Sequence, residues 1–89
     1  MDFIWDTSKA RANISKHSVD FPTASRIFLD PYLIEFEDER GYGERRWNAI
    51  GMVDERILFV TYTEENEYYR IISARGAEPH EKRRYHNEI

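Results

Sequence analysis

The spacing of apolar residues predicts a helix near the start of the chain. Ala10, Ile14 and His17 recur at intervals of four and three, which places them on one face of a helix. Asp6 precedes this segment and is a candidate N-cap, because its carboxylate can accept hydrogen bonds from the free N–H groups of the first turn. A neighbouring polar face is expected to carry Lys9, Asn13 and Lys16.

A second helix is predicted after Asp20, another N-cap candidate. It begins at Phe21-Pro22, since proline is tolerated in a first turn. Its buried stripe is expected to consist of Ala24, Ile27 and Phe28. Asp30-Pro31 ends it, because the residue before a proline is disfavoured in the α region.

After Pro31 the apolar residues alternate with a period of two, which is typical of strands. Four strands are predicted, over residues 32–38, 46–53, 57–63 and 68–74. The last two are apolar at successive positions, which predicts that both of their faces are covered. Short polar connections join the last three strands, so these are expected to form an antiparallel meander.

A charged segment, residues 78–88, is predicted to form a C-terminal helix, and Phe3-Ile4 is a candidate for a short extra strand. The expected fold class is therefore α+β, with two N-terminal helices, a four-stranded and mainly antiparallel sheet, and a C-terminal helix. A chain of 89 residues is expected to form a single domain over residues 1–89.

The composition excludes several functional classes. The chain has no cysteine, which excludes a disulfide scaffold, a thiolate zinc site and a cysteine nucleophile. The histidines show no metal-binding spacing, and neither a phosphate-binding glycine loop nor a serine elbow is present, so we expect no metal and no cofactor. No apolar run approaches the ~20 residues that span a bilayer. The N-terminus lacks the pattern of a signal peptide, so we expect a cytoplasmic protein with no membrane partner.

The charge of the chain is unevenly distributed. The net charge is −4, which by itself argues against a nucleic-acid-binding protein. Residues 1–44 carry this whole excess, whereas residues 45–89 are neutral and contain eight of the thirteen basic residues. Ten of the thirteen are arginines, whose planar guanidinium suits two-point contacts with phosphate. A local arginine cluster is therefore compatible with the overall acidity.

These residue types are sufficient for RNA cleavage without a metal. That reaction needs a base for the 2′-hydroxyl, cationic donors for the pentavalent phosphorane and an acid for the leaving oxygen. Arg70 and Arg75 are the most suggestive donors, but their spacing puts them on opposite faces of a regular strand unless a bulge intervenes. The alternative is that Arg70 pairs with a carboxylate across the sheet, such as Glu35 or Glu37. Arg46 is a further candidate for contact with a phosphate. Its neighbour Arg45 points to the opposite face of the strand.

Other candidates lie on the predicted helices. His17 titrates near neutral pH and suits proton transfer, but at a helix end it also suits capping of free carbonyls. Tyr85 suits stacking or acid catalysis, and equally the anchoring of a terminal helix. Lys9, Lys16 and Arg84 are candidates for contacts with the RNA backbone.

The ordered blocks of the sequence resemble the BrnT toxins of bacterial type II toxin–antitoxin systems. The resemblance runs from about Phe3 to Tyr85, and its most specific block is Arg70-Ile71-Ile72-Ser73-Ala74-Arg75, followed by Ala77, Glu81 and Arg84-Tyr85. Earlier carriers are Trp5-Asp6 with Lys9, the Lys16-His17 pair, Phe28-Leu29-Asp30-Pro31 and Arg45-Arg46-Trp47. The chain departs from the family at Ser18, where glycine is common, and at Gly76, where a basic residue is common.

The resemblance implies a RelE-like ribonuclease fold and a metal-independent endoribonuclease that inhibits translation. It also implies a cognate antitoxin with a ribbon-helix-helix DNA-binding domain, a heterotetrameric complex, and contact with operator DNA only through that antitoxin. Carried onto this chain, the candidate catalytic residues are His17, Arg46, Arg70, Arg75 and Tyr85, and the candidate RNA-binding residues are Lys9, Lys16 and Arg84. Aromatic candidates for antitoxin docking are Tyr42, Trp47 and Tyr68. The residues do not distinguish base from acid, and a catalytically weak binding module that acts through the antitoxin is the alternative.

Overall fold

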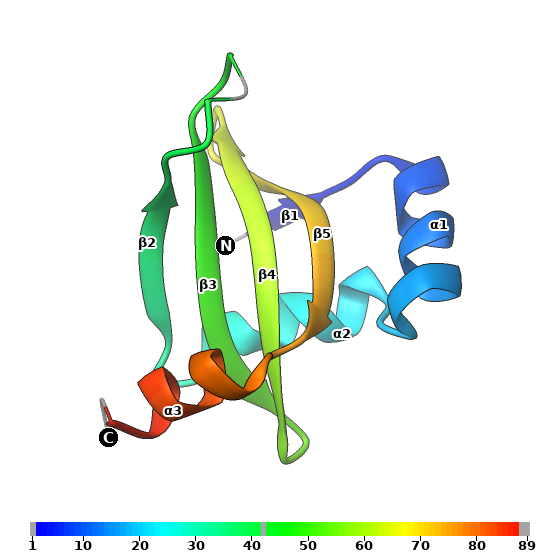
Figure 1. Ribbon diagram of the computed structural model, residues 1–89. Helices are drawn as coiled ribbons and strands as arrows, with labels where there is room; N and C mark the ends of the chain where they lie inside the picture. The colour runs from blue at the N-terminus through cyan, green and yellow to red at the C-terminus, as the bar shows by residue number, and fades with distance from the viewer. Residues whose placement is uncertain (1, 42, 88–89) are drawn as a thin grey trace.

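The computed structural model describes residues 2–41 and 43–87 and shows an α+β fold (Figure 1). A short strand comes first and is followed by two helical segments, a run of four strands and a last helix. The elements are β1 Asp2–Ile4, α1 Thr7–His17, α2 Phe21–Ser25, a 3₁₀ helix Arg26–Leu29, β2 Ile34–Asp38, β3 Arg46–Val53, β4 Arg56–Glu65, β5 Tyr68–Gly76 and α3 Pro79–Asn87. The predicted class and order of elements are confirmed.

The sheet has five strands, in the order β1-β5-β4-β3-β2. The predicted antiparallel meander is present, because β2, β3, β4 and β5 pair antiparallel with their neighbours. The short extra strand for which Phe3-Ile4 was a candidate is present as β1 and joins the four predicted strands. It pairs in parallel with the first half of β5, with Ile4 opposite Arg70. The sheet is therefore mixed.

Several boundaries differ from the prediction. The second helix is α-helical only to Ser25 and continues as the 3₁₀ helix, and β2 begins at Ile34 rather than at residue 32 because Pro31 and Tyr32 form a turn. The β4–β5 connection is only the two-residue turn Asn66-Glu67, where Asn66 adopts a positive φ of 58°. Both strands are accordingly longer than predicted.

One face of the sheet, the core face, packs against α2, the 3₁₀ helix and the start of the chain. Its buried cluster includes Phe21 and Ile27 from the helical segments and Ala49, Val60 and Ile71 from the strands. Gly51 lets the 3₁₀ helix approach β3 closely, since a Cβ at this position would lie 2.8 Å from Ile27 Cβ. Burial of this cluster supplies the main favourable free energy of folding.

The opposite face, the open face, carries the alternate residues of each strand. A smaller cluster of Ile50, Ile57 and Tyr85 joins its lower end to α3. Figure 1 shows α3 at this end and no other helix of the described chain on the rest of the face. The prediction that both faces of β4 and β5 are covered therefore holds only near α3.

Helix α1 seals the edge of β5 through a side chain that the sequence placed on a polar face. Asn13 is buried, and its amide donates to the carbonyl of Ala74 at 2.7 Å and accepts from the N–H of Ala74 at 3.1 Å. It also donates to the carbonyl of Val19 at 2.9 Å. β1 pairs with β5 only as far as Arg70, so the backbone beyond it needs polar partners. This is why Asn13 is buried, whereas Ile14, predicted to be buried, is 50% exposed.

Replacing Ser18 by glycine is expected to stabilise the protein. Ser18 follows α1 with φ 58° and ψ 32°, and its N–H donates to the carbonyl of Ile14. A residue with a Cβ is destabilised by roughly 1 kcal/mol in this left-handed region, whereas glycine is not. We expect the free energy of unfolding of Ser18→Gly to rise by about 0.5–1 kcal/mol, measured by thermal unfolding.

Ser15→Gly is the matched control, because Ser15 is exposed inside α1. Glycine in a helix interior costs roughly 0.5–1 kcal/mol, so this variant should melt at a lower temperature. A lower melting temperature for both variants would contradict the proposed strain at Ser18.

Candidate active site

A bulge in β5 places Arg70 and Arg75 on the same face of the sheet. Thr61 of β4 lies opposite Ser73, but the next residue, Tyr62, lies opposite Ile71, so Ile72 is an extra residue in β5. The extra residue reverses the alternation for the first half of the strand. Without a bulge, Arg70 and Arg75 would lie on opposite faces of the strand. The bulge is present, so both can act on the same face.

Arg46 and Arg70 belong to a row of polar residues that crosses the open face. Asp38 of β2 lies opposite Arg46 of β3, and Thr63 of β4 lies opposite Arg70 of β5. The β3–β4 register pairs Trp47 with Tyr62, so its continuation brings Arg46 beside Thr63. We call these four residues, Asp38, Arg46, Thr63 and Arg70, the arginine row. Two guanidinium groups, with side chains 20% and 28% exposed, thus lie on the open face and are separated by a single strand.

Carboxylates from the β2–β3 connection and from the end of β4 neutralise Arg70. Its Nη2 lies 2.8 Å from both carboxylate oxygens of Glu44, and its Nε lies 2.9 Å from Glu65. Glu44 also lies 3.9 Å from Nε of Arg46. Burial alone would lower the pKa of Arg70, but these hydrogen bonds raise it, so the guanidinium is always charged. The two oxygens of Glu44 occupy the position that a phosphate would take on the same guanidinium.

The structure corrects the partners that the sequence suggested for Arg70. Glu35 and Glu37 alternate onto the core face, where Glu35 accepts a hydrogen bond from the hydroxyl of Tyr62 and Glu37 pairs with Arg45 at 2.8 Å. Arg70 does have carboxylate partners, as the structural alternative proposed, but they are Glu44 of the β2–β3 connection and Glu65 at the end of β4. The prediction that Arg45 points away from Arg46 is consistent with its pairing to Glu37.

Arg75 lies further along the open face, toward α3. Its guanidinium makes two hydrogen bonds to Glu81, at 2.8 and 2.9 Å, and lies 4.3 Å from the centre of the Phe59 ring. Arg84 of α3 similarly covers the ring of Phe36 at 4.4 Å. Both contacts combine charge–quadrupole attraction with packing. They place two further guanidinium groups between the arginine row and α3.

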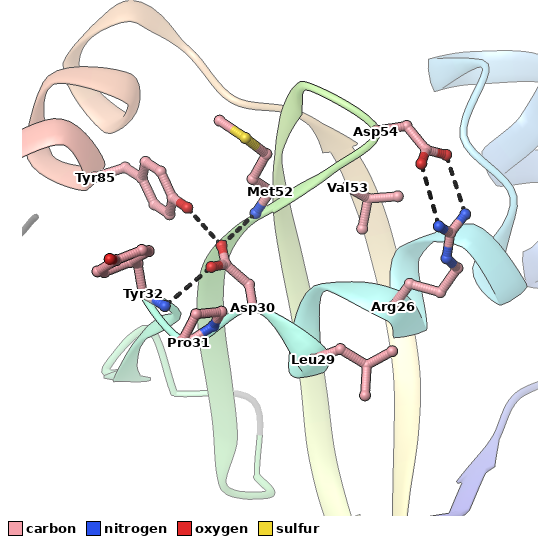
Figure 2. Close-up of a pocket in the computed structure, with 9 residues that line it drawn as sticks. All are labelled: Arg26, Leu29, Asp30, Pro31, Tyr32, Met52, Val53, Asp54 and Tyr85. Carbon is pink, nitrogen blue, oxygen red and sulfur yellow. Dashed lines mark hydrogen bonds and ion pairs between the residues drawn. The ribbon is translucent and has the colours of Figure 1, made fainter.

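Tyr85 anchors α3, as Figure 2 shows. It is 2% exposed, and its hydroxyl donates to Asp30 Oδ2 at 2.6 Å. Asp30 also accepts from the backbone N–H groups of Tyr32 and Met52, at 2.9 and 2.8 Å. Burial, followed by the hydrogen bond and charge of Asp30, raises the pKa of Tyr85 to about 12. The hydroxyl stays protonated at neutral pH, and these contacts match the anchoring alternative.

The three candidates on α1 are not brought to the arginine row. His17 is half-buried at the last turn of α1, and Lys9 and Lys16 are exposed on the same helix. Figure 1 shows α1 beside β5 at the opposite side of the molecule from α3. Of the eight candidate residues, the structure therefore gathers Arg46, Arg70, Arg75 and Arg84 on the open face and leaves three on α1.

Residues that the sequence analysis did not select also border this face. Arg40 binds Asp38 through two hydrogen bonds of 2.9 and 2.7 Å. His80 lies at the start of α3, with Nε2 3.9 Å from Glu81, so an imidazole stands near Arg75. Asn48 and Thr61 are buried next to the arginine row and share a hydrogen bond of 2.8 Å. Asn48 could have been predicted from the alternation of β3, because it lies two residues from Arg46 and therefore on the same face.

The aromatic residues selected for antitoxin docking do not form one patch in the described structure. Trp47 is half-buried against the core cluster, with Arg45 over its ring at 5.2 Å, and Tyr68 is 42% exposed at the start of β5. Tyr42 lies outside the described residues. Leu29 and Tyr32 are 82% and 51% exposed, and both line a pocket of about 420 Å³ beside Asp30 and Tyr85 (Figure 2).

A family model described as the ribonuclease toxin BrnT of type II toxin–antitoxin systems matches residues 5–81. This range covers α1, α2, the 3₁₀ helix and strands β2 to β5, and it ends in the first turn of α3. The chain belongs to the BrnT toxin family. No individual curated protein matches it in addition.

Membership of the BrnT family gives the open face a chemical context. BrnT toxins are ribonuclease toxins, and a type II system pairs such a toxin with a cognate antitoxin. The substrate of a ribonuclease is a polyanion, and guanidinium groups are the protein donors that best match its phosphates. None of the described helices is long and apolar enough to cross a bilayer.

Proposed function

We propose that this BrnT toxin is a metal-independent endoribonuclease whose reaction takes place on the open face. The observation that carries this proposal is the arginine row, where Arg46 and Arg70 lie across one strand from each other at the end of the open face that no described helix covers. An α+β fold with a mainly antiparallel sheet agrees with the RelE-like architecture that the family resemblance implies.

In this proposal Arg46 and Arg70 bind the scissile phosphate and stabilise the phosphorane. Attack by the 2′-hydroxyl on phosphorus concentrates negative charge on the non-bridging oxygens, and fixed guanidinium donors stabilise this charge more in the transition state than in the bound substrate. The 5′-oxygen leaves with a proton, and the product is a 2′,3′-cyclic phosphate. Arg75 and Arg84, with the rings of Phe59 and Phe36, provide adjacent positions for backbone and base contacts.

The cognate antitoxin is proposed to carry a ribbon-helix-helix domain and to bind the toxin as a heterotetramer. It would neutralise the toxin and contact operator DNA itself, while the toxin contacts RNA alone. A DNA-binding antitoxin with a basic side fits a toxin of net charge −4.

Binding of the antitoxin is tested by co-expression with the neighbouring reading frame. Induction of the toxin alone should arrest growth, and co-induction of the antitoxin should restore it. We expect the two proteins to co-purify with a dissociation constant below about 1 μM, roughly −8 kcal/mol or more favourable. Calorimetry measures this constant, and absence of binding would contradict the proposed pairing.

The alternative is a binding module with little catalytic activity. It is favoured by the ion pairs of Arg70 with Glu44 and Glu65, which engage its Nη2 and Nε and compete with a phosphate for them. Growth arrest that requires no RNA cleavage, or no growth arrest at all, would support this alternative.

A further inference from the structure

A second cationic pocket lies at the end of the sheet away from the arginine row. Its volume is about 600 Å³, within the range of small-ligand sites. It is formed where β4 begins, β5 ends and α3 passes over them. The lining residues that carry or can gain charge are Arg56, Lys82, His86 and Glu55. Two permanent cations therefore face one carboxylate.

Arg56 and Lys82 of this pocket lack the carboxylate partners that several arginines of the chain have. Arg26, Arg45, Arg70 and Arg75 each lie within 3.0 Å of a carboxylate oxygen. Within residues 2–41 and 43–87, no side chain forms an ion pair or hydrogen bond with Arg56 or Lys82. Their charges are thus available to an external anion.

The backbone fixes the position of the Arg56 guanidinium. Its Nη2 packs over Gly76, at 3.1 Å from the position that a Cβ would occupy there. A side chain at position 76 would press on this guanidinium and shift it slightly. Gly76 therefore makes room for a cation at the rim of the pocket.

The pocket continues the line of cations along β5. Gly76 directly follows Arg75, and the six residue steps from Arg70 to Gly76 span about 20 Å of extended strand. A single-stranded RNA held at Arg70 and extended along this strand passes Arg75 before it reaches Lys82 of α3. Arg56 comes to the same pocket from the core-face side of β4, because it alternates in phase with the buried Leu58. We infer that the pocket formed by Arg56, Lys82, His86 and Gly76 binds a phosphate of the RNA several nucleotides from the cleaved bond. The inference rests on the proposed ribonuclease function.

Salt-dependent binding of a non-cleavable RNA tests the inference. The probe is a labelled 2′-O-methyl single strand of about 12 nucleotides, a length within the site sizes of single-strand-binding domains. For Arg56→Gln and Lys82→Gln we expect binding about three- to tenfold weaker than wild type. The slope of log K against log salt should fall by about 0.7 for each lost phosphate contact. Arg83→Gln is the matched control, since Arg83 is an exposed neighbour on α3 that does not line the pocket.

Cleavage of a dinucleotide separates failure of the inference from failure of the proposed function. A dinucleotide is too short to reach the pocket, so Arg56→Gln and Lys82→Gln should cleave it at the wild-type rate. Equal RNA affinity and slope for the pocket variants and Arg83→Gln would overturn the inference, even if the wild type cleaves RNA. Weakened binding of the antitoxin with unchanged RNA binding would also overturn it. If RNA binding depends on the pocket but the protein cleaves neither substrate, the proposed ribonuclease function is refuted and the assignment of the pocket as an RNA-binding site stands. Melting curves and the conservative Arg56→Lys variant exclude misfolding as the cause.

Discussion

Replacing Arg70 by lysine is expected to lower the rate of RNA cleavage by about 10²–10³-fold, which corresponds to roughly 3–4 kcal/mol of transition-state stabilisation. A lysine keeps the charge, but its single ammonium cannot reproduce the planar pair of donors that a guanidinium offers to a phosphate. The Arg70 side chain is 28% exposed and its partners Glu44 and Glu65 are 36% and 53% exposed, so the free energy of unfolding should change by only about 0–1 kcal/mol. Cleavage kinetics measured beside melting curves separate the two effects.

Arg45→Lys is the matched control for this variant. Arg45 is next to Arg46 in the sequence and also pairs with a glutamate, Glu37, but on the core side of the sheet. We expect wild-type cleavage from it. Full activity in Arg70→Lys would show that Arg70 is not part of the site. Loss of activity in both variants would show that the effect is not specific to the open face.

The carboxylates on Arg70 provide an independent test of the same site. Because Glu44 occupies the guanidinium that the phosphate must reach, Glu44→Gln should strengthen RNA binding, whereas Glu37→Gln should leave it unchanged. If the Arg70–Glu44 pair has no role in RNA binding, Glu44→Gln and Glu37→Gln should bind RNA with equal affinity.

Removing the Glu81 carboxylate is expected to have the largest effect on stability. The Glu81 side chain is 8% exposed, and it accepts from the Arg75 guanidinium and from the N–H of Glu78 at the start of α3. Glu81→Ala leaves these donors without partners, which for a partly exposed pair costs about 2–3 kcal/mol. The melting temperature should fall accordingly. Glu78→Gln is the control: Glu78 is 58% exposed and 3.6 Å from Arg75, so about 0–0.5 kcal/mol is expected.

The Glu81 contact also predicts a pH dependence. Burial raises the pKa of Glu81, but the hydrogen bonds from Arg75 and from the Glu78 N–H together outweigh it and hold the pKa below its usual range. A depressed pKa in the folded state stabilises the protein fully above the unfolded value of about 4.3, and this contribution disappears as the pH falls through the folded value. Wild type should therefore lose more stability than Glu81→Gln between about pH 4.5 and pH 2. Parallel losses in the two proteins would contradict the contact.

Alternation of apolar and polar residues was enough to predict β3, and it placed Arg46 and Arg45 on opposite faces. The N-caps Asp6 and Asp20 were also predictable, because both accept the expected backbone N–H, from Lys9 and Thr23. The bulge at Ile72 was not predictable, since no glycine or proline marks it. It arises from how β5 pairs with β4, and it decides which face Arg70 occupies.

The partners of the site residues were the least predictable part. Glu44 reaches Arg70 from the β2–β3 connection and Glu65 from the end of β4, and both contacts depend on strand register, so the sequence suggested Glu35 and Glu37 instead. Burial of Asn13 likewise depends on where β1 stops pairing with β5. The contacts of Arg70 with Glu44 and of Asn13 with Ala74 join residues that are far apart in the chain.

The most direct test of the proposed function is cleavage of RNA by the purified toxin in excess EDTA. The account predicts undiminished cleavage and a product that ends in a 2′,3′-cyclic phosphate or a 3′-phosphate, because the arginine row supplies the charge stabilisation that a metal ion would otherwise provide. Cleavage that EDTA abolishes and Mg²⁺ restores would contradict it.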